Sequence, residues 1–250
     1  MKIAIISDIH GNLDALNSVL KNIEKEKCEK IFCLGDLAMA GPEPKETISK
    51  IQSLIKDEKL YTIQGNTDEM LSVFSFDTYN KTLELNPVMG SAYLADSQLL
   101  SEEEKSFLAK LPAQFDTEIS GVKILCVHGS PRKNNENIFP DMPVEQVEEM
   151  IKGTTANVIF CGHTHTPCGY QTNTNQTVVN VGSVGRPFTA NPDSCYAIMT
   201  IDEANSTFKI EHKFVKYDKE SAAEKVRKRG FDGAEKLAEM LIKPQTRYPQ

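Results

Sequence analysis

Residues 158–167, VIFCGHTHTP, place two of the chain's five histidines two positions apart, directly after an apolar run. The run VIFC predicts a short buried strand, and the polar residues begin where that strand ends. His163 and His165 alternate as residues of an extended segment do, so their side chains face the same side. Two imidazoles in this arrangement indicate a metal site, although the pair alone is as compatible with a structural role.

Four other predicted strands end in the same way. The polar residues that follow them are Asp8 and His10 after residues 2–7, Asp36 after 30–35, Asn66 after 60–65, and His128 after 122–127. Sites in parallel α/β sheets are built where the carboxyl ends of the strands meet. Each residue alone could be a helix N-cap or a structural histidine. Capping does not explain why four of five histidines follow strand ends, with only His212 elsewhere, so together they predict a metal site.

The number and type of donors indicate two ions rather than one. Seven donors exceed what a tetrahedral zinc ion accepts, and they suit two divalent ions that share a bridging carboxylate. Imidazole, carboxylate and amide donors together favour Mn, Fe, Co, Ni or Zn. A centre of this kind activates a bridging hydroxide and holds a phosphate for in-line attack. The donors are Asp8, His10, Asp36, Asn66, His128, His163 and His165.

The order of predicted elements indicates an α/β fold. Strands and helices alternate over residues 1–65, which predicts parallel strands joined by crossover helices. A helical insertion is expected at about 69–114, antiparallel strands after 168, and two helices at about 218–242. No linker is evident, so residues 1–250 are expected to form one domain. The charged run at 225–229, KVRKR, is expected to be a solvated helix face.

Composition limits the partners. A net charge of −7 disfavours nucleic acid and anionic membranes, and no run is long enough for a membrane helix. The six cysteines include no C-x-x-C pair, and we expect them to be small core residues rather than ligands or disulfides. The protein is therefore expected in a reducing compartment, the cytoplasm. A homo-oligomer is compatible with these features.

The ordered blocks DIH, GDLAMAGP, GNTD, HG and GHTH resemble those of the calcineurin-like metallophosphoesterases, and the resemblance extends over residues 1 to about 187, including NVGSVGRP. It implies a four-layer α-β-β-α sandwich of two mixed β-sheets. It also implies a ligand assignment: Asp8, His10 and His165 on one ion, Asn66, His128 and His163 on the other, and Asp36 as the bridge. Asn66 would also position the phosphate, and Mn²⁺ is the expected metal, with Fe, Ni, Co or Zn as alternatives.

One departure from the family pattern bears on the substrate. Many members have a histidine after the GN pair that protonates the leaving oxygen, whereas this chain has Thr67, whose hydroxyl is far too weak an acid. Small prokaryotic members that lack this histidine resemble phosphodiesterases, so we expect a small phosphodiester or nucleotide substrate. Val181 replaces a proline of the family pattern without chemical consequence. Arg186 could contact the substrate phosphate bidentately or simply cap a loop.

Other functions remain open from the sequence. They are a phosphomonoesterase acting on proteins or small molecules, a dinucleoside polyphosphate hydrolase, and a non-catalytic scaffold such as the retromer subunit with this fold. The scaffold has a degraded ligand set, whereas all seven donors are present here. Met70, Phe74, Phe76 and Tyr79, in the helical insertion, could contact a substrate or simply pack the insertion.

Overall fold

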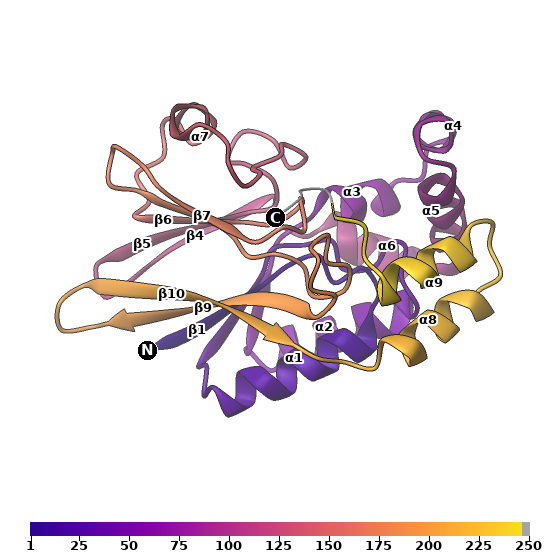
Figure 1. The fold of residues 1–250 in the computed structure, drawn as a ribbon, viewed down its shortest axis with the longest axis horizontal. Coiled ribbons are helices and arrows are strands. Elements are labelled where there is room, and N and C mark those ends of the chain that lie inside the picture. The colour runs from indigo at the N-terminus through magenta and orange to yellow at the C-terminus, as the bar shows by residue number, and fades with distance from the viewer. Residues whose placement is uncertain (247–250) are drawn as a thin grey trace.

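The computed structural model describes residues 1–246, whose strands form two five-stranded sheets (Figure 1). The first sheet has the order β10 (Thr207–Val215), β9 (Ser194–Asp202), β1 (Lys2–Ile6), β2 (Lys30–Cys33) and β3 (Leu60–Thr62). The second has the order β4 (Gln114–Ile119), β5 (Val122–Val127), β6 (Val158–Cys161), β8 (Thr177–Asn180) and β7 (Cys168–Gln171).

Both sheets are mixed. In the first, β1, β2 and β3 are parallel, while β9 pairs antiparallel with β1 and β10 antiparallel with β9. In the second, β5, β6 and β8 are parallel, and β4 and β7 are antiparallel edge strands. The predicted α/β class with two mixed sheets is confirmed.

The period-2 alternation of β1 explains the layering. Ile3 and Ile5 point between the sheets and pack in one core with Phe32, Phe160 and residues of β5 and β9. Ala4 and Ile6 point outward against helices α1 (Leu13–Lys25) and α2 (Pro44–Lys56). On the other side, α7 (Val144–Met150) packs on the outer face of the second sheet. The result is the expected four-layer α-β-β-α sandwich.

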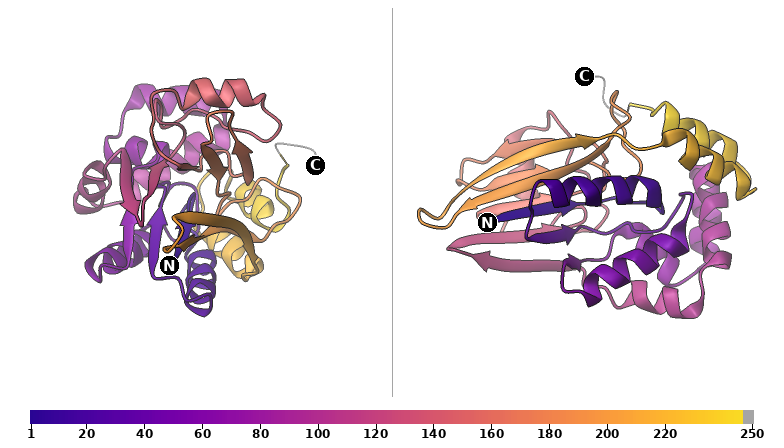
Figure 2. Two further views of the ribbon diagram at one scale, coloured as in Figure 1. Left: turned by 90° about the vertical axis from the view of Figure 1, so that its left-hand side faces the viewer. Right: turned by 90° about the horizontal axis from the view of Figure 1, so that it is seen from below.

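The remaining helices gather at the end of the sandwich where β1 ends (Figures 1 and 2). Four lie between β3 and β4, in the range predicted to be a helical insertion, and two follow β10. They are α3 (Asn66–Ser72), α4 (Phe76–Leu85), α5 (Pro87–Leu99), α6 (Glu102–Ala109), α8 (Lys219–Lys228) and α9 (Ala234–Ile242). Met70, Phe74 and Tyr79 pack on the core, whereas Phe76 is exposed.

The expectation of a solvated face at 225–229 is wrong for two of its cations. Lys225 contacts Asp14 of α1 and Glu43 at 2.7–2.9 Å. Arg229 pairs with the fully buried Asp96 of α5 at 2.6 Å. These partners could not be predicted from the charge run itself, because they lie more than a hundred residues away in the sequence.

The cysteines are free thiols, as expected from the sequence. All six thiols are free, and four of them are buried among apolar side chains. Across residues 1–246, none of the helices has the length and apolar character needed to cross a membrane.

Candidate metal centre

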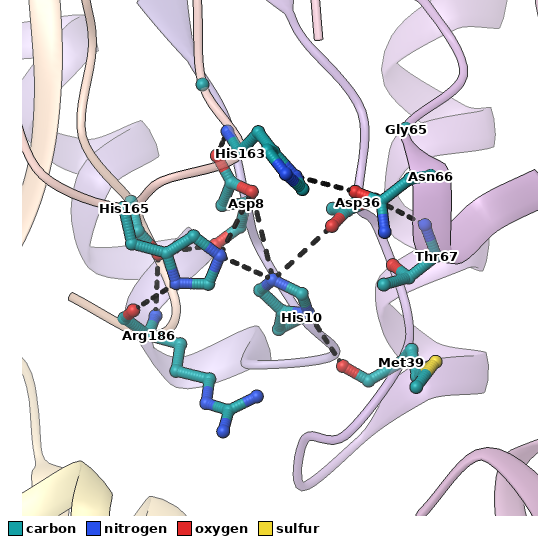
Figure 3. Close-up of polar contacts among 12 residues, drawn as sticks. Asp8, His10, Asp36, Met39, Gly65, Asn66, Thr67, His163, His165 and Arg186 are labelled. Carbon is teal, nitrogen blue, oxygen red and sulfur yellow. Dashed lines mark hydrogen bonds and ion pairs between the residues drawn. The ribbon is translucent and has the colours of Figure 1, made fainter. Parts of the chain in front are cut away.

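The seven predicted donors come together where strands of both sheets end, and Figure 3 labels all of them except His128. In the first sheet, Asp8 and His10 follow β1, Asp36 follows β2, and Asn66 opens α3 after β3. In the second, His128 follows β5, and the GHTH segment follows β6. Gly162 donates its amide to the His128 carbonyl oxygen at 2.8 Å within the second sheet. The His163 amide donates to Asp8 Oδ2 at 3.0 Å, and this bond joins the two sheets at the site.

Asp8, His10 and His165 form the first group of donors. The Nε2 atoms of His10 and His165 are 3.1 Å apart, and Asp8 Oδ1 lies 3.2 Å from His165 Nε2 and 3.8 Å from His10 Nε2. All three side chains are at most 6% exposed. This is the set that the resemblance assigned to one ion.

Asn66, His128 and His163 form the second group. Asn66 Oδ1 lies 3.0 Å from His128 Nε2 and 2.8 Å from His163 Nδ1. Asn66 and His163 are only partly buried, unlike the first group, so the centre meets solvent on this side.

Asp36 lies between the two groups. Its Oδ2 atom is 3.6 Å from His10 Nε2 and 3.4 Å from His128 Nε2, while Oδ1 accepts the amide of Thr67 at 2.9 Å. Asp8 also approaches both groups, but less evenly, because its Oδ1 atom is 4.0 Å from His128 Nε2. The position of Asp36 is compatible with the predicted bridging role, although the carboxylate of Asp8 also lies within reach of both groups.

Backbone carbonyl oxygens orient three of the imidazoles. The Nδ1 atoms of His10, His128 and His165 contact the carbonyl oxygens of Met39, Leu34 and Arg186 at 2.8, 2.7 and 2.5 Å. A carbonyl oxygen accepts only from a protonated nitrogen, so each Nδ1 carries hydrogen and each Nε2 is directed into the site. Such contacts behind metal-ligating histidines fix the tautomer and raise ligand basicity.

The residues present fit a pair of bound cations. Two Nε2 lone pairs facing each other at 3.1 Å repel unless a proton or a cation is shared between them. Asp8 Oδ1 is buried and makes no hydrogen bond to any group of residues 1–246. Buried polar atoms are almost always satisfied, so this carboxylate oxygen and the two imidazoles match the donor set that a divalent ion takes.

The ionisation of the site agrees with this fit. Burial alone would raise the pKa of Asp8, but His165 and His128 together lower it to about 2. Burial would likewise raise the pKa of Asp36, but His128 and His10 hold it well below its usual range. Burial lowers the pKa of His10 and of His163 to about 4, so both rings are neutral at pH 7. Burial opposes charge on His128 too, yet Asp36 and Asp8 raise its pKa to about 10. A cation bound there would displace that proton.

Five of the seven donors have left-handed backbone conformations. The φ angles of Asp8, His10, Asp36, His163 and His165 lie between 49° and 66°. Non-glycine residues adopt this region at a cost and cluster there at functional sites. The sharp turns that result direct consecutive side chains of a strand end toward one point.

Asp68 is a site residue whose role the sequence did not reveal beyond a helix cap. Its carboxylate accepts the amides of Asp36, Leu37 and Gly65 at 2.8–3.0 Å and so joins the second and third strand ends. Burial, and then the charge of Asp36, raise its pKa to about 7. The GN-x-D spacing places an acidic residue in the first turn of α3, but it does not show that this residue, Asp68, accepts amides of the loop that follows β2.

Arg186 lies beside the first group of donors (Figure 3). It is 8% exposed, its carbonyl oxygen holds His165, and its guanidinium is 5.3 Å from the ring centre of Phe188 and contacts Met89 Sδ at 3.0 Å. Phe188 in turn stacks on His165 with ring centres 4.6 Å apart. Arg186 is therefore not a surface residue, and its contact with substrate phosphate stays a prediction.

Comparison with known proteins places this site in a family. Residues 1–204 match the model of the calcineurin-like phosphoesterase superfamily domain. An uncharacterised protein of Methanocaldococcus jannaschii, MJ0912, is 33% identical over 241 residues, covering 90% of this chain and 91% of that protein. A bis(5′-nucleosyl)-tetraphosphatase, PrpE of Oceanobacillus iheyensis, is 28% identical over 115 residues, 42% of this chain and 44% of that protein.

Solved structures agree with this placement. A metallophosphoesterase from Sphaerobacter thermophilus superposes with a TM-score of 0.75 and 26% identity over 97% of this chain and 98% of its own. The hypothetical protein PH1004 from Pyrococcus horikoshii superposes with a TM-score of 0.86 and 23% identity over 98% and 99%, which shows a shared fold. With its strand-end motifs, its two mixed sheets and a family match over most of its length, this chain belongs to the calcineurin-like phosphoesterase superfamily and is a phosphoric ester hydrolase.

Proposed function

We propose that this hydrolase holds two divalent ions and cleaves phosphodiesters of small or nucleotide substrates. The observation that carries the proposal is the convergence of seven donors in two groups with Asp36 between them. Two bound ions supply an activated water and neutralise charge on the phosphate. The mixed donor set suits Mn, Fe, Co, Ni or Zn, and Mn²⁺ is the metal we expect and would test first.

The chain's own residues define how the substrate approaches. Asn66 and His163 are partly exposed while His10 and His165 are nearly closed off, so the phosphate enters on the side of Asn66. Asn66 Oδ1 faces two imidazoles, which leaves its Nδ2 group as the part of the amide that can donate to a phosphate oxygen. Arg186 adds positive charge beside the first group and is the candidate for a second phosphate contact.

The absence of an imidazole acid favours a diester. Four of the five histidines belong to the two donor groups, and the fifth, His212, contacts the carbonyl oxygen of Asn180 at 2.7 Å. The side chain after Asn66 is the buried Thr67, whose hydroxyl does not protonate a leaving oxygen at neutral pH. Substrates whose leaving group departs as a stable anion fit this site.

A dinucleoside polyphosphate is a second candidate substrate. Its support is the partial match to PrpE, an asymmetrical bis(5′-nucleosyl)-tetraphosphatase by name. The leaving group in such a reaction is a nucleotide phosphate, which departs without protonation. The lack of an imidazole acid is therefore as compatible with this substrate as with a diester.

The test compares substrates on protein stripped with a chelator and reloaded with Mn²⁺. We expect two Mn²⁺ per chain and a kcat/KM for bis(4-nitrophenyl) phosphate at least about tenfold above that for glycerol phosphate, an alkyl monoester, since a missing acid typically costs 10²–10⁴-fold when the leaving group is poor. Diadenosine tetraphosphate and cyclic nucleotides complete the panel. Preference for the monoester would overturn the diester proposal, and one ion per chain or none would overturn the dinuclear centre.

A further inference from the structure

The loop from Asp36 to Glu43 is attached along its length to the segment that carries His10. The amides of His10 and Gly11 donate to the carbonyl oxygens of Asp36 and Leu37 at 2.9 and 2.8 Å, and the Glu43 amide donates to Gly11 O at 2.7 Å. A Cβ atom on Gly41 would lie 1.6 Å from His10 O, so the two backbones are in direct contact. A shift of this loop therefore moves His10 and the Met39 carbonyl oxygen that orients its ring.

Two residues from distant helices hold the far side of the same loop. Asp96 of α5 accepts the Ala40 amide through Oδ2 at 2.8 Å, and Arg229 at the end of α8 donates from Nη1 to Gly41 O at 2.8 Å. The two side chains form an ion pair of 2.6 Å between Arg229 Nη2 and Asp96 Oδ1. Asp96 is fully buried and the Arg229 side chain is 12% exposed.

The contacts from Asp96 and Arg229 lie next to a strained residue of the loop. Ala40 has a φ angle of 64°, a left-handed conformation that a residue with a Cβ adopts only when its surroundings enforce it. Asp96 and Arg229 bind the amide and carbonyl groups on either side of the peptide from Ala40 to Gly41. The ion pair thus holds the backbone on both sides of the peptide bond that follows the strained residue Ala40.

The pair is not explained by helix packing alone. A buried ion pair pays for the desolvation of both charges, and an apolar pair of similar volume often docks two helices equally well. What an apolar pair cannot do is bind backbone amide and carbonyl groups of the loop. The charges are placed where they act on residues 40 and 41.

We propose that Asp96 and Arg229 are positioning residues for the metal centre, acting through the loop and the Met39 carbonyl oxygen on His10. The inference rests on the dinuclear centre proposed above. It gives the C-terminal helices, which lie beyond the matched family domain at residues 1–204, a function in ion binding.

Mn²⁺ binding to the full, metal-stripped chain tests this role by titration calorimetry. Arg229→Met removes the contact with Gly41 O but leaves Asp96 as an unpaired buried charge. The double variant Asp96→Asn with Arg229→Met removes that charge and keeps an acceptor for the Ala40 amide. We expect both to bind Mn²⁺ about tenfold more weakly, the lower end of the loss seen when a partner behind a ligand is removed. We expect kcat to fall at saturating Mn²⁺ while KM changes little.

Arg227→Met is the matched control. Arg227 is on the same helix and pairs with Glu235 of α9 at 2.9 Å, so its loss removes an equal charge and an ion pair that holds α8, without touching the loop. We expect wild-type Mn²⁺ affinity for this variant. Equal weakening in Arg227→Met would show that helix docking, not contact with the loop, matters, and would overturn the inference.

Arg229→Lys is a milder substitution that can still be measured if the other variants fail to fold. Lysine keeps a charge opposite Asp96 but lacks the second arm that reaches Gly41 O, so an intermediate loss of affinity is expected with a melting temperature close to wild type. Wild-type affinity in any folded Arg229 variant overturns the inference and leaves the dinuclear centre intact. If the unaltered protein binds no Mn²⁺, the proposed centre itself fails, and the inference fails with it.

Discussion

His10 and His165 direct their Nε2 atoms at each other across 3.1 Å, although each ring has its Nδ1 atom committed to a backbone carbonyl oxygen. One residue follows the first strand of one sheet and the other follows a strand of the second sheet, 155 positions later. Rotation of either ring would break its carbonyl contact. The two sheets therefore hold these lone pairs together, and a bound cation would relieve their repulsion.

Asparagine substitutions separate the two groups of donors. In His165→Asn and His128→Asn the amide Nδ2 can still donate to Arg186 O or Leu34 O, whereas the Nε2 donor is lost. We expect each variant to retain one Mn²⁺ of two by elemental analysis after desalting, and to lose activity by more than about a hundredfold, the upper end for losing a residue behind a ligand.

His212→Gln is the control for replacing a partly buried histidine that contacts a backbone carbonyl oxygen. Its Nε2 can still donate to the Asn180 carbonyl oxygen, and His212 lies outside both donor groups. This variant is expected to keep two ions and full activity. Retention of both ions in His165→Asn or His128→Asn would contradict the ligand assignment.

Thr67→His tests the reason for diester preference. The new imidazole would follow Asn66 at the start of α3, close to the phosphate, and could protonate a leaving alkoxide. Turnover of an alkyl monoester such as glycerol phosphate is expected to rise at least about tenfold, which is part of the 10²–10⁴-fold that a well-placed general acid supplies.

Thr67→Val serves as the comparison, because it fills the same buried site without a hydroxyl. It should leave alkyl monoester turnover unchanged. An unchanged rate in a folded, metal-loaded Thr67→His variant would show that the leaving group is not limited by protonation.

Much of the fold and of the donor set could be predicted because the signals are local. Strands such as residues 2–6 and 158–161 are short apolar runs, and each ends in the residues that now converge. The α/β class, the two mixed sheets and the family are confirmed. Parallel strands bring their carboxyl ends to one edge, so spacing along the chain is enough to place such residues together.

The contacts behind the donors could not be predicted because they join distant segments. Asp68 reaches the amides that follow β2, and Asp96 reaches Ala40 over 56 positions. The carbonyl oxygens of Leu34, Met39 and Arg186 have no signature at all, since every residue has one. Arg229 was misjudged for the same reason, because an arginine on a helix looks solvated until its buried partner is known.

Arg186→Met tests a direct contact with the phosphate. Methionine keeps much of the apolar stem beside Phe188 and Met89 but removes the charge. A lost charged hydrogen bond of about 1.5–3 kcal/mol corresponds to about a 10- to 150-fold rise in KM for bis(4-nitrophenyl) phosphate. Arg186→Lys should recover part of this. Unchanged KM with reduced Mn²⁺ binding would instead assign Arg186 to the support of His165 through its carbonyl oxygen.

The ion pair between Asp96 and Arg229 should give the stability of the protein a characteristic pH dependence. Burial raises the pKa of Asp96 from 3.8 to about 6, against the opposing effects of Arg229 and of the Ala40 amide. The folded chain therefore holds this proton more tightly than the unfolded chain. The contribution of Asp96 to the free energy of unfolding falls as the pH rises from about 4 to about 6, and is constant above that range.

Comparison with Asp96→Asn isolates this group, since asparagine does not titrate and Arg229 stays charged throughout. We expect the difference in unfolding free energy, wild type minus Asp96→Asn, to fall by up to about 3 kcal/mol between pH 4 and pH 7 in urea denaturation. All other titrating groups are common to both chains and cancel. A difference that grows with pH would mean that the attraction of Arg229 exceeds the cost of burial, so that the pKa of Asp96 lies below 3.8 rather than above it.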